Sequence, residues 1–140
     1  MTLRWEMLIE KDIQKILHQL AEGSGIQIPV EGSDINIRFL DNDSKLSLSS
    51  SVYHGGNYIP SSVRDCLSHK SPFSHLSSIY TYLFIDEQRY QIYLHYLGHA
   101  NILNLEELKN LLEEFNAIAE KWRFYLDEHD KHDLIYVRVK

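Results

Sequence analysis

The feature that most constrains the fold of this chain is a long run of apolar residues at helical spacing between Asn104 and Glu128. These residues recur at steps of three and four, which places them on one stripe of an α-helix. They are Leu105, Leu108, Leu111, Leu112, Phe115, Ile118, Ala119, Trp122 and Leu126. Asn104 is placed to cap the helix, with Glu107 three residues later as in a capping box. A stripe of this length must be covered by other parts of the chain.

The preceding segments predict a sheet that provides this cover. Alternating apolar and polar residues indicate strands near 35–40, 45–52, 79–85 and 90–97. A weaker strand near 25–30 contains Pro29, which restricts it to a sheet edge. Helical spacing indicates a first helix over 3–22 and a short helix over 62–69, while 134–139 predicts a last short strand after a polar break at 129–133. The predicted fold class is α+β: one domain over 1–140, with an antiparallel sheet, an N-terminal helix and a long C-terminal helix.

The predicted strand over 79–85 is apolar on both of its faces. Its aliphatic side carries Ile79, Leu83 and Ile85, and its aromatic side carries Tyr80, Tyr82 and Phe84. A strand of this kind is usually covered on both sides. The long helix can cover one side, so a second subunit is a candidate cover for the other. Tyrosine is common at protein interfaces, but aromatic packing between neighbouring strands explains the same residues.

The bulk composition excludes several classes of protein. A net charge of −6 argues against a non-specific nucleic-acid binder, which normally shows a basic face. Cys66 is the single cysteine, so no intrachain disulfide is expected. No stretch approaches the roughly 20 apolar residues of a membrane span, and charged residues interrupt any signal-peptide pattern near the N-terminus. We therefore expect a cytosolic protein.

No motif in the sequence predicts catalysis or metal binding. His95 and His99 would share one face of a helix, but Gly98 and the alternating pattern favour a strand end, and no cysteine pair completes a metal site. A lone thiol such as Cys66 is more often a small core residue than a nucleophile. Glycine-rich phosphate loops and a nucleophile elbow are absent. We therefore expect no enzyme activity, no metal and no cofactor.

The order of the predicted elements resembles the type III secretion chaperones that protect individual effectors, the Tir-chaperone or CesT-like family. Members have an N-terminal helix, three strands, a short helix, two strands and a long closing helix. The segment LNLEELKNLLEEFNAIAEKWRFYL is similar to that closing helix. The resemblance covers most of the chain, and the strand predicted over 134–139 is an addition to the family pattern. It implies a cytoplasmic, bacterial, non-enzymatic chaperone that keeps a secreted effector soluble and secretion-competent.

The resemblance also implies two contact surfaces. The short helix and the strand after it would form the contact of a homodimer, or of a heterodimer, through Val63, Leu67, Tyr80 and Tyr82. An extended segment of the effector would dock between the first helix and the first three strands. The candidates for that groove are Leu8, Ile9, Ile16, Leu17, Ile35, Ile37, Leu46 and Leu48, some of which must instead belong to the core.

Two other classes of function stay open at this point. A small enzyme or metal-binding domain would use the histidine-rich loop over 54–75 as its site. A regulatory module that binds and inhibits another protein would have the same acidic α+β build. Identification of the partner separates such a module from a chaperone.

Overall fold

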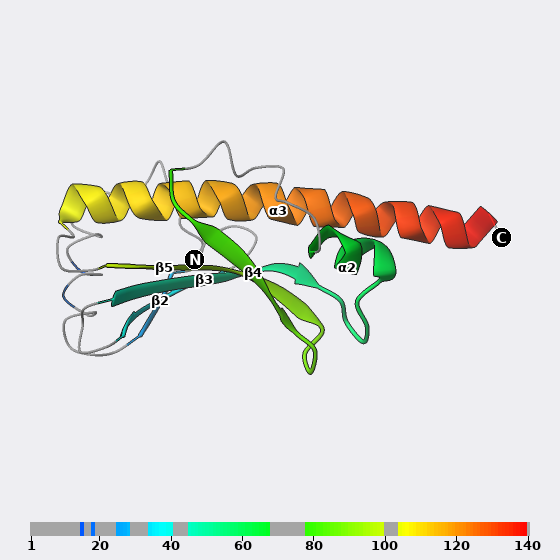
Figure 1. The fold of residues 1–140 in the computed structure, drawn as a ribbon, viewed down its shortest axis with the longest axis horizontal. Coiled ribbons are helices and arrows are strands. Elements are labelled where there is room, and N and C mark those ends of the chain that lie inside the picture. The colour runs from blue at the N-terminus through cyan, green and yellow to red at the C-terminus, as the bar shows by residue number, and fades with distance from the viewer. Residues whose placement is uncertain are drawn as a thin grey trace.

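The computed structural model describes residues 15, 18, 25–28, 34–40, 45–67, 78–99 and 104–139, and of these only the backbone for 105 and 131–139. Its strands are β1 (Ile26–Ile28), β2 (Ile35–Leu40), β3 (Lys45–His54), β4 (Thr81–Asp86) and β5 (Gln91–His99), and its helices are α2 (Ser61–Leu67) and α3 (Leu105–Val139). They form two layers, a five-stranded sheet and α3 lying along one of its faces (Figure 1). The predicted α+β class is confirmed. The predicted first helix over 3–22 lies outside the described residues except for Lys15 and His18, which are helical.

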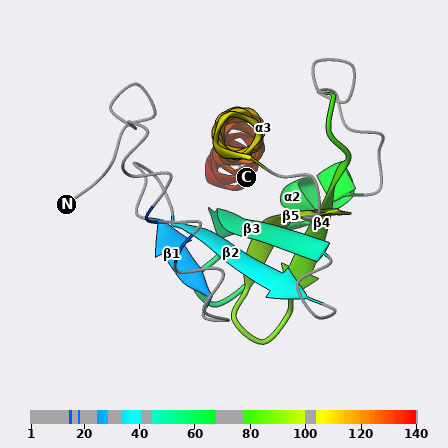
Figure 2. The same ribbon diagram turned by 90° about the vertical axis from the view of Figure 1, so that its left-hand side faces the viewer.

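The sheet is antiparallel throughout, with the strand order β1-β2-β3-β5-β4. Figure 2 looks along α3 and shows the sheet beneath it. Each strand lies within two or three residues of its predicted position. β1 has three residues and forms one edge, as Pro29 directly after it predicts. β4 forms the other edge.

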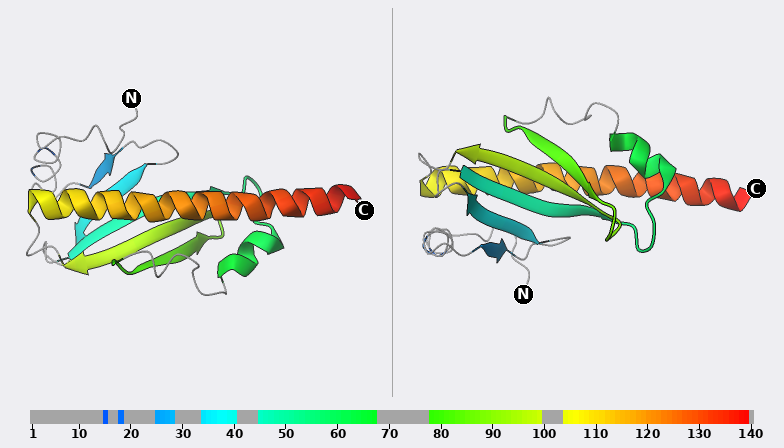
Figure 3. Two further views of the ribbon diagram at one scale, coloured as in Figure 1. Left: turned by 90° about the horizontal axis from the view of Figure 1, so that it is seen from above. Right: turned by 60° about the horizontal axis from the view of Figure 1, so that its bottom comes forward.

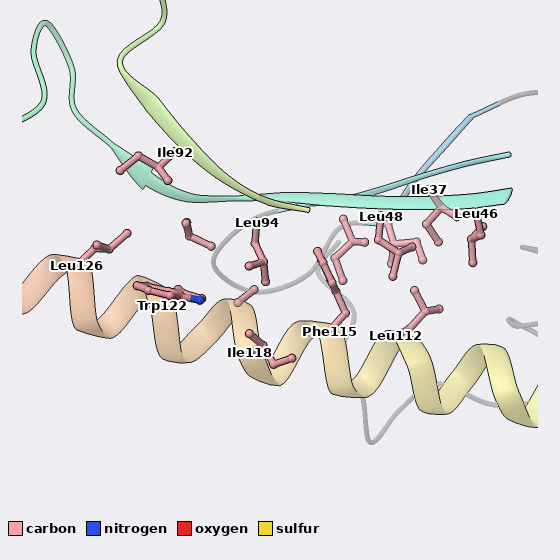
Figure 4. Close-up of a cluster of buried hydrophobic side chains, with 14 of the residues drawn as sticks. Ile37, Leu46, Leu48, Ile92, Leu94, Leu112, Phe115, Ile118, Trp122 and Leu126 are labelled. Carbon is pink, nitrogen blue, oxygen red and sulfur yellow. The ribbon is translucent and has the colours of Figure 1, made fainter. Parts of the chain in front are cut away.

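The core lies between the sheet and α3, as Figure 4 shows. Alternate residues of the strands point toward the helix, because successive side chains of a strand face opposite sides of the sheet. The side chains with 0–1% exposure that meet in this layer are Ile35, Ile37, Leu46, Leu48, Ile92 and Leu94 from the strands, and Leu108, Leu112, Phe115, Ala119 and Leu126 from α3. The helical stripe predicted from the sequence therefore packs on the predicted sheet.

The start of α3 is fixed by the predicted cap. The backbone amide of Glu107 donates to Asn104 Oδ1 at 2.8 Å, and Asn104 Nδ2 donates to Glu107 Oε1 at 3.0 Å. The return bond thus joins the two side chains, where a standard capping box would use the backbone amide of the cap residue. Further along the helix, Glu114 accepts from the amide and hydroxyl of Ser78, which holds the segment leading into β4 against α3.

The predicted polar break at 129–133 and the predicted strand over 134–139 are wrong, because α3 continues to Val139. Neither glycine nor proline occurs in residues 105–139, and adding residues to an existing helix avoids the cost of nucleation. A strand also needs a hydrogen-bonding neighbour. Figure 1 shows this end of α3 beyond the sheet, where no strand of the described part of the chain lies beside it.

Replacing Trp122 by alanine should destabilise the protein strongly. The indole is 3% exposed and packs in the core layer, so its loss leaves a cavity and should lower the free energy of unfolding by about 3–5 kcal/mol. Phe124→Ala is the matched control, since its ring lies two residues away on the same helix and is 70% exposed. Denaturant unfolding followed by circular dichroism measures both. Equal stability of the two variants would contradict this packing of α3.

Candidate partner-binding surface

The face of the sheet that points away from α3 carries exposed aromatic side chains. In β4, Leu83 and Ile85 pack against the core, so the alternating residues Tyr82 and Phe84 point to the opposite face. They are 45% and 52% exposed, and Tyr80, just before β4, is 81% exposed. Large apolar residues gathered on one exposed face are uncommon in a chain that acts alone.

Cross-strand pairing assembles these side chains into one cluster. Tyr82 lies opposite His95 of β5 and Phe84 lies opposite Tyr93. The ring of Tyr82 stacks on the imidazole of His95, with centroids 5.4 Å apart and planes at 21°. Phe84 and Tyr93 meet the same imidazole edge-on, at 5.7 and 6.4 Å. We refer to Tyr82, Phe84, Tyr93 and His95 as the aromatic patch.

A polar groove of about 580 Å³ adjoins the aromatic patch on the β1–β3 side of the same face. His95 lines both surfaces, and Arg38 and Gln27 line the groove together with Ser47 and Ser49. The strands that form this face run at an angle to α3, as Figure 3 shows. A partner on this face would therefore meet apolar rings over β4 and β5 and hydrogen-bonding groups over β1 to β3.

Burial lowers the pKa of His95 from its usual value of 6.5. Its surroundings explain the direction, because aromatic rings from β4 and β5 cover the imidazole and oppose its protonation. The remaining groups that face it are Ser49, directly opposite on β3, and Arg38 across the groove. None of these groups carries a negative charge that would favour the imidazolium, so His95 is neutral at pH 7.

The unfolding free energy should fall as the pH drops below about 6.5, in part through His95. Above that pH the imidazole is neutral in the folded and unfolded states; below it, the unfolded chain binds the proton first, which favours unfolding. His95→Gln should reduce this pH dependence, whereas His99→Gln, at an exposed position on the same strand, should not. Denaturant titrations at pH 5 and 7.5 measure the difference. The same pH dependence in His95→Gln and the unmodified protein would show that this imidazole does not contribute.

The eight residues predicted to line an effector groove fall into two groups. Ile35, Ile37, Leu46 and Leu48 are core residues with 0–1% exposure, in contact with α3 and not with solvent. Leu8, Ile9, Ile16 and Leu17 lie outside the described residues.

The four residues expected at a dimer contact also fall into two groups. Val63 of α2 is fully buried and Leu67 is half-buried against the core, whereas Tyr80 and Tyr82 are exposed. Phe84, Tyr93 and His95 are not among the residues predicted at the dimer contact. Their alternation with buried residues was a usable signal, but the pairing of Phe84 with Tyr93 depends on the register set by the turn between β4 and β5.

The two alternative sites are a nucleophile at Cys66 and a metal site built from histidines. Cys66 is 5% exposed and its thiol donates to the carbonyl of Ser62 at 3.3 Å. Burial raises the pKa of Cys66, which opposes formation of the thiolate that a nucleophile needs. His95 and His99 both belong to β5, which continues two residues beyond the strand predicted over 90–97. Across the described ranges, no three His, Cys, Asp or Glu side chains come together as a metal site, and His69 and His75 lie outside those ranges.

Comparison with solved structures finds chains of the same architecture in several protein complexes. A chain of the ExsC–ExsE complex matches 86% of this chain and 97% of its own length, with a TM-score of 0.61 and 17% identity. A chain of the HopA1–SchA chaperone–effector complex matches 85% and 93%, with a TM-score of 0.57 and 14% identity. A chain of the heterodimeric ExoU–SpcU complex from the type III secretion system of Pseudomonas aeruginosa matches 83% and 95%, with a TM-score of 0.54 and 16% identity.

This chain has their fold. The match spans 83–86% of this chain and 93–97% of each of those chains. At such low identity the likeness establishes the fold and leaves the activity to be argued from the surfaces. No protein-family model matches the sequence, and no curated protein matches it either. None of the helices in the described ranges is long and apolar enough to cross a membrane.

Proposed function

We propose that this protein is a non-enzymatic type III secretion chaperone that binds an extended segment of a secreted effector in the bacterial cytoplasm and keeps it soluble. The observation that carries the proposal is the fold, which matches a chain of the HopA1–SchA chaperone–effector complex over 93% of its length and a chain of the ExoU–SpcU complex of a type III secretion system over 95%. The aromatic patch adds an exposed surface of the kind that protein partners cover. Binding of this type consumes no nucleotide: burial of surface offsets the entropy lost when the effector segment becomes ordered.

We further propose that the chaperone acts as a homodimer through the edge strand β4 and α2. Tyr80 and Tyr82 are exposed at that edge, and Phe84 extends the same surface. Val63 is fully buried, so its role is to hold α2 on the core. Leu67 is half-buried at the edge of that core. The neighbouring ion pair of Arg64 with Glu87, at 2.9 Å, ties α2 to the turn between β4 and β5 and fixes the geometry of the edge.

Tyr82→Asp should convert the dimer to a monomer without unfolding it. A carboxylate on the aromatic patch would have to be buried without a partner, and central aromatic residues contribute at least about 2 kcal/mol to many interfaces, or roughly thirtyfold in affinity. Light scattering should give twice 16.5 kDa for the unmodified protein and 16.5 kDa for the variant, with equal circular dichroism. Tyr58→Asp is the control, because Tyr58 is 56% exposed outside the patch. A dimeric Tyr82→Asp variant would place the dimer contact elsewhere.

Co-expression with secreted proteins of the same genome, one at a time, tests the chaperone function. The cognate effector should be soluble only in the presence of this protein, and the two should elute as one complex of defined mass. Leu17→Asp should weaken that complex while preserving circular dichroism if Leu17 contacts the effector, whereas Leu48→Asp should unfold the protein because Leu48 is fully buried. Solubility of every candidate effector without the protein, and no co-elution, would reject the function.

A further inference from the structure

The third strand of the sheet extends past its neighbour and leaves a free edge. β2 begins at Ile35, which lies opposite Ser50 of β3. Residues 51–54 of β3 pair with β5 on one side and, within the described ranges, with no strand on the side where β2 ends. Figure 3 shows β3 running on beyond β2. An unpaired edge of this kind is where an extended chain adds to a sheet.

A cavity of about 700 Å³ lies beside this free edge, between β3 and the second half of α3. The described residues that line it are Asp34, Ser51, Val52, Tyr53, His54, Arg123, Phe124, Asp127 and Asp130. Between Ser51 and Tyr53 the pairing with β5 slips by one residue. Such an irregularity re-aims side chains, and Tyr53 hydrogen-bonds with Asp130 of α3.

The guanidinium of Arg123 joins α3 to β3 through two hydrogen bonds. Its Nε donates to the carbonyl of Ser51 at 3.1 Å, and its Nη2 donates to Ser50 Oγ at 2.8 Å. Ser50 in turn donates to the carbonyl of Asp34 at 2.9 Å and is fully buried. These bonds join α3, β3 and the start of β2, so the wall formed by Arg123 is fixed in place.

The charge of the described lining favours a basic occupant. Among these residues, Asp34, Asp127 and Asp130 supply three carboxylates and Arg123 supplies one guanidinium. Tyr53 does not add to the negative charge, because burial and then Asp130 raise the pKa of its hydroxyl, which stays protonated. A carboxylate oxygen accepts more than one hydrogen bond, so the bond with Tyr53 leaves Asp130 able to accept another.

The exposed ring of Phe124 supplies the second element of recognition. It is 70% exposed, and it lines the cavity together with Asp127, one turn further along α3. An aromatic face beside carboxylates suits arginine, whose planar guanidinium stacks on the ring while its N–H groups reach the carboxylate oxygens. Lysine offers a compact charge without this planar fit.

We infer that this cavity binds an extended segment of the effector whose backbone pairs with residues 52–54 and whose arginine side chain stacks on Phe124 and bonds to Asp127 and Asp130. This inference rests on the proposed chaperone function and adds the chemistry of the segment that is recognised. The cavity lies on the α3 side of the sheet, so it is separate from the aromatic patch and stays open when that patch is covered.

A fluorescent peptide of alternating threonine and valine with one central arginine tests the site. Its binding to the full-length protein is measured by anisotropy and compared with that of the same peptide carrying citrulline, which keeps the shape and removes the charge. We expect the arginine peptide to bind about tenfold more tightly, because hydrogen bonds between charged groups are lost with citrulline. Phe124→Ala and Asp127→Asn should each weaken the arginine peptide several-fold, and Leu97→Ala, at an exposed position on β5 that does not line the cavity, should not.

Equal binding of the two peptides, or no binding of the arginine peptide to folded protein, would overturn the inference. Unchanged binding of the arginine peptide to Phe124→Ala would also overturn it, because this side chain is exposed and its removal leaves the core packing intact. A failed peptide experiment together with a co-eluting effector would reject this site and leave the chaperone function standing. Arginine-dependent peptide binding without any effector complex would support the site and reject the function.

Discussion

The contact between α3 and one face of the sheet is the interaction on which the rest of this structure depends. Leu112, Phe115 and Trp122 lie against Leu48 and Leu94, and every fully buried large side chain of the described core belongs to this layer. α3 has 35 residues, which at 1.5 Å per residue corresponds to about 52 Å, and it is longer than any strand beneath it. Among the described elements, α3 covers one face of the sheet, while the aromatic patch on the opposite face and the cavity near the end of β3 are exposed.

Both partner surfaces follow from that arrangement. The aromatic patch exists because β4 and β5 alternate between residues packed on α3 and residues that face away from it. The cavity lies where β3 extends past β2, so α3 passes over a part of β3 that has, among the described residues, no strand neighbour on one side. The first surface is aromatic, and the second is acidic and lies beside the end of β3. The proposals above give the first to a second copy of the chain and the second to an extended effector segment.

Much of the fold was predictable because its signals are local. The spacing of Leu108, Leu112 and Phe115 predicts a helix whatever covers it, and Asn104 with Glu107 marks its start. The end of α3 was missed because residues 134–139 have strand-like composition, and only the position of the helix beyond the sheet shows that no strand partner is available there. The candidate sites were less predictable. The sequence does not distinguish a core position from a groove position at Ile35 or Ile37. The hydrogen bond from Arg123 to Ser51 joins residues that are far apart in the chain, so no local pattern predicts it.

The alternation along β4 and β5 has a consequence for how such a protein changes over time. Leu83 and Leu94 maintain the core, while Tyr82 and Tyr93, their immediate neighbours in the chain, face outward. Substitutions at the outward positions leave the packing under α3 intact, so the surface that meets a partner can diverge while the fold persists. Chains that share this architecture at 14–17% identity show how much sequence change the fold itself accommodates.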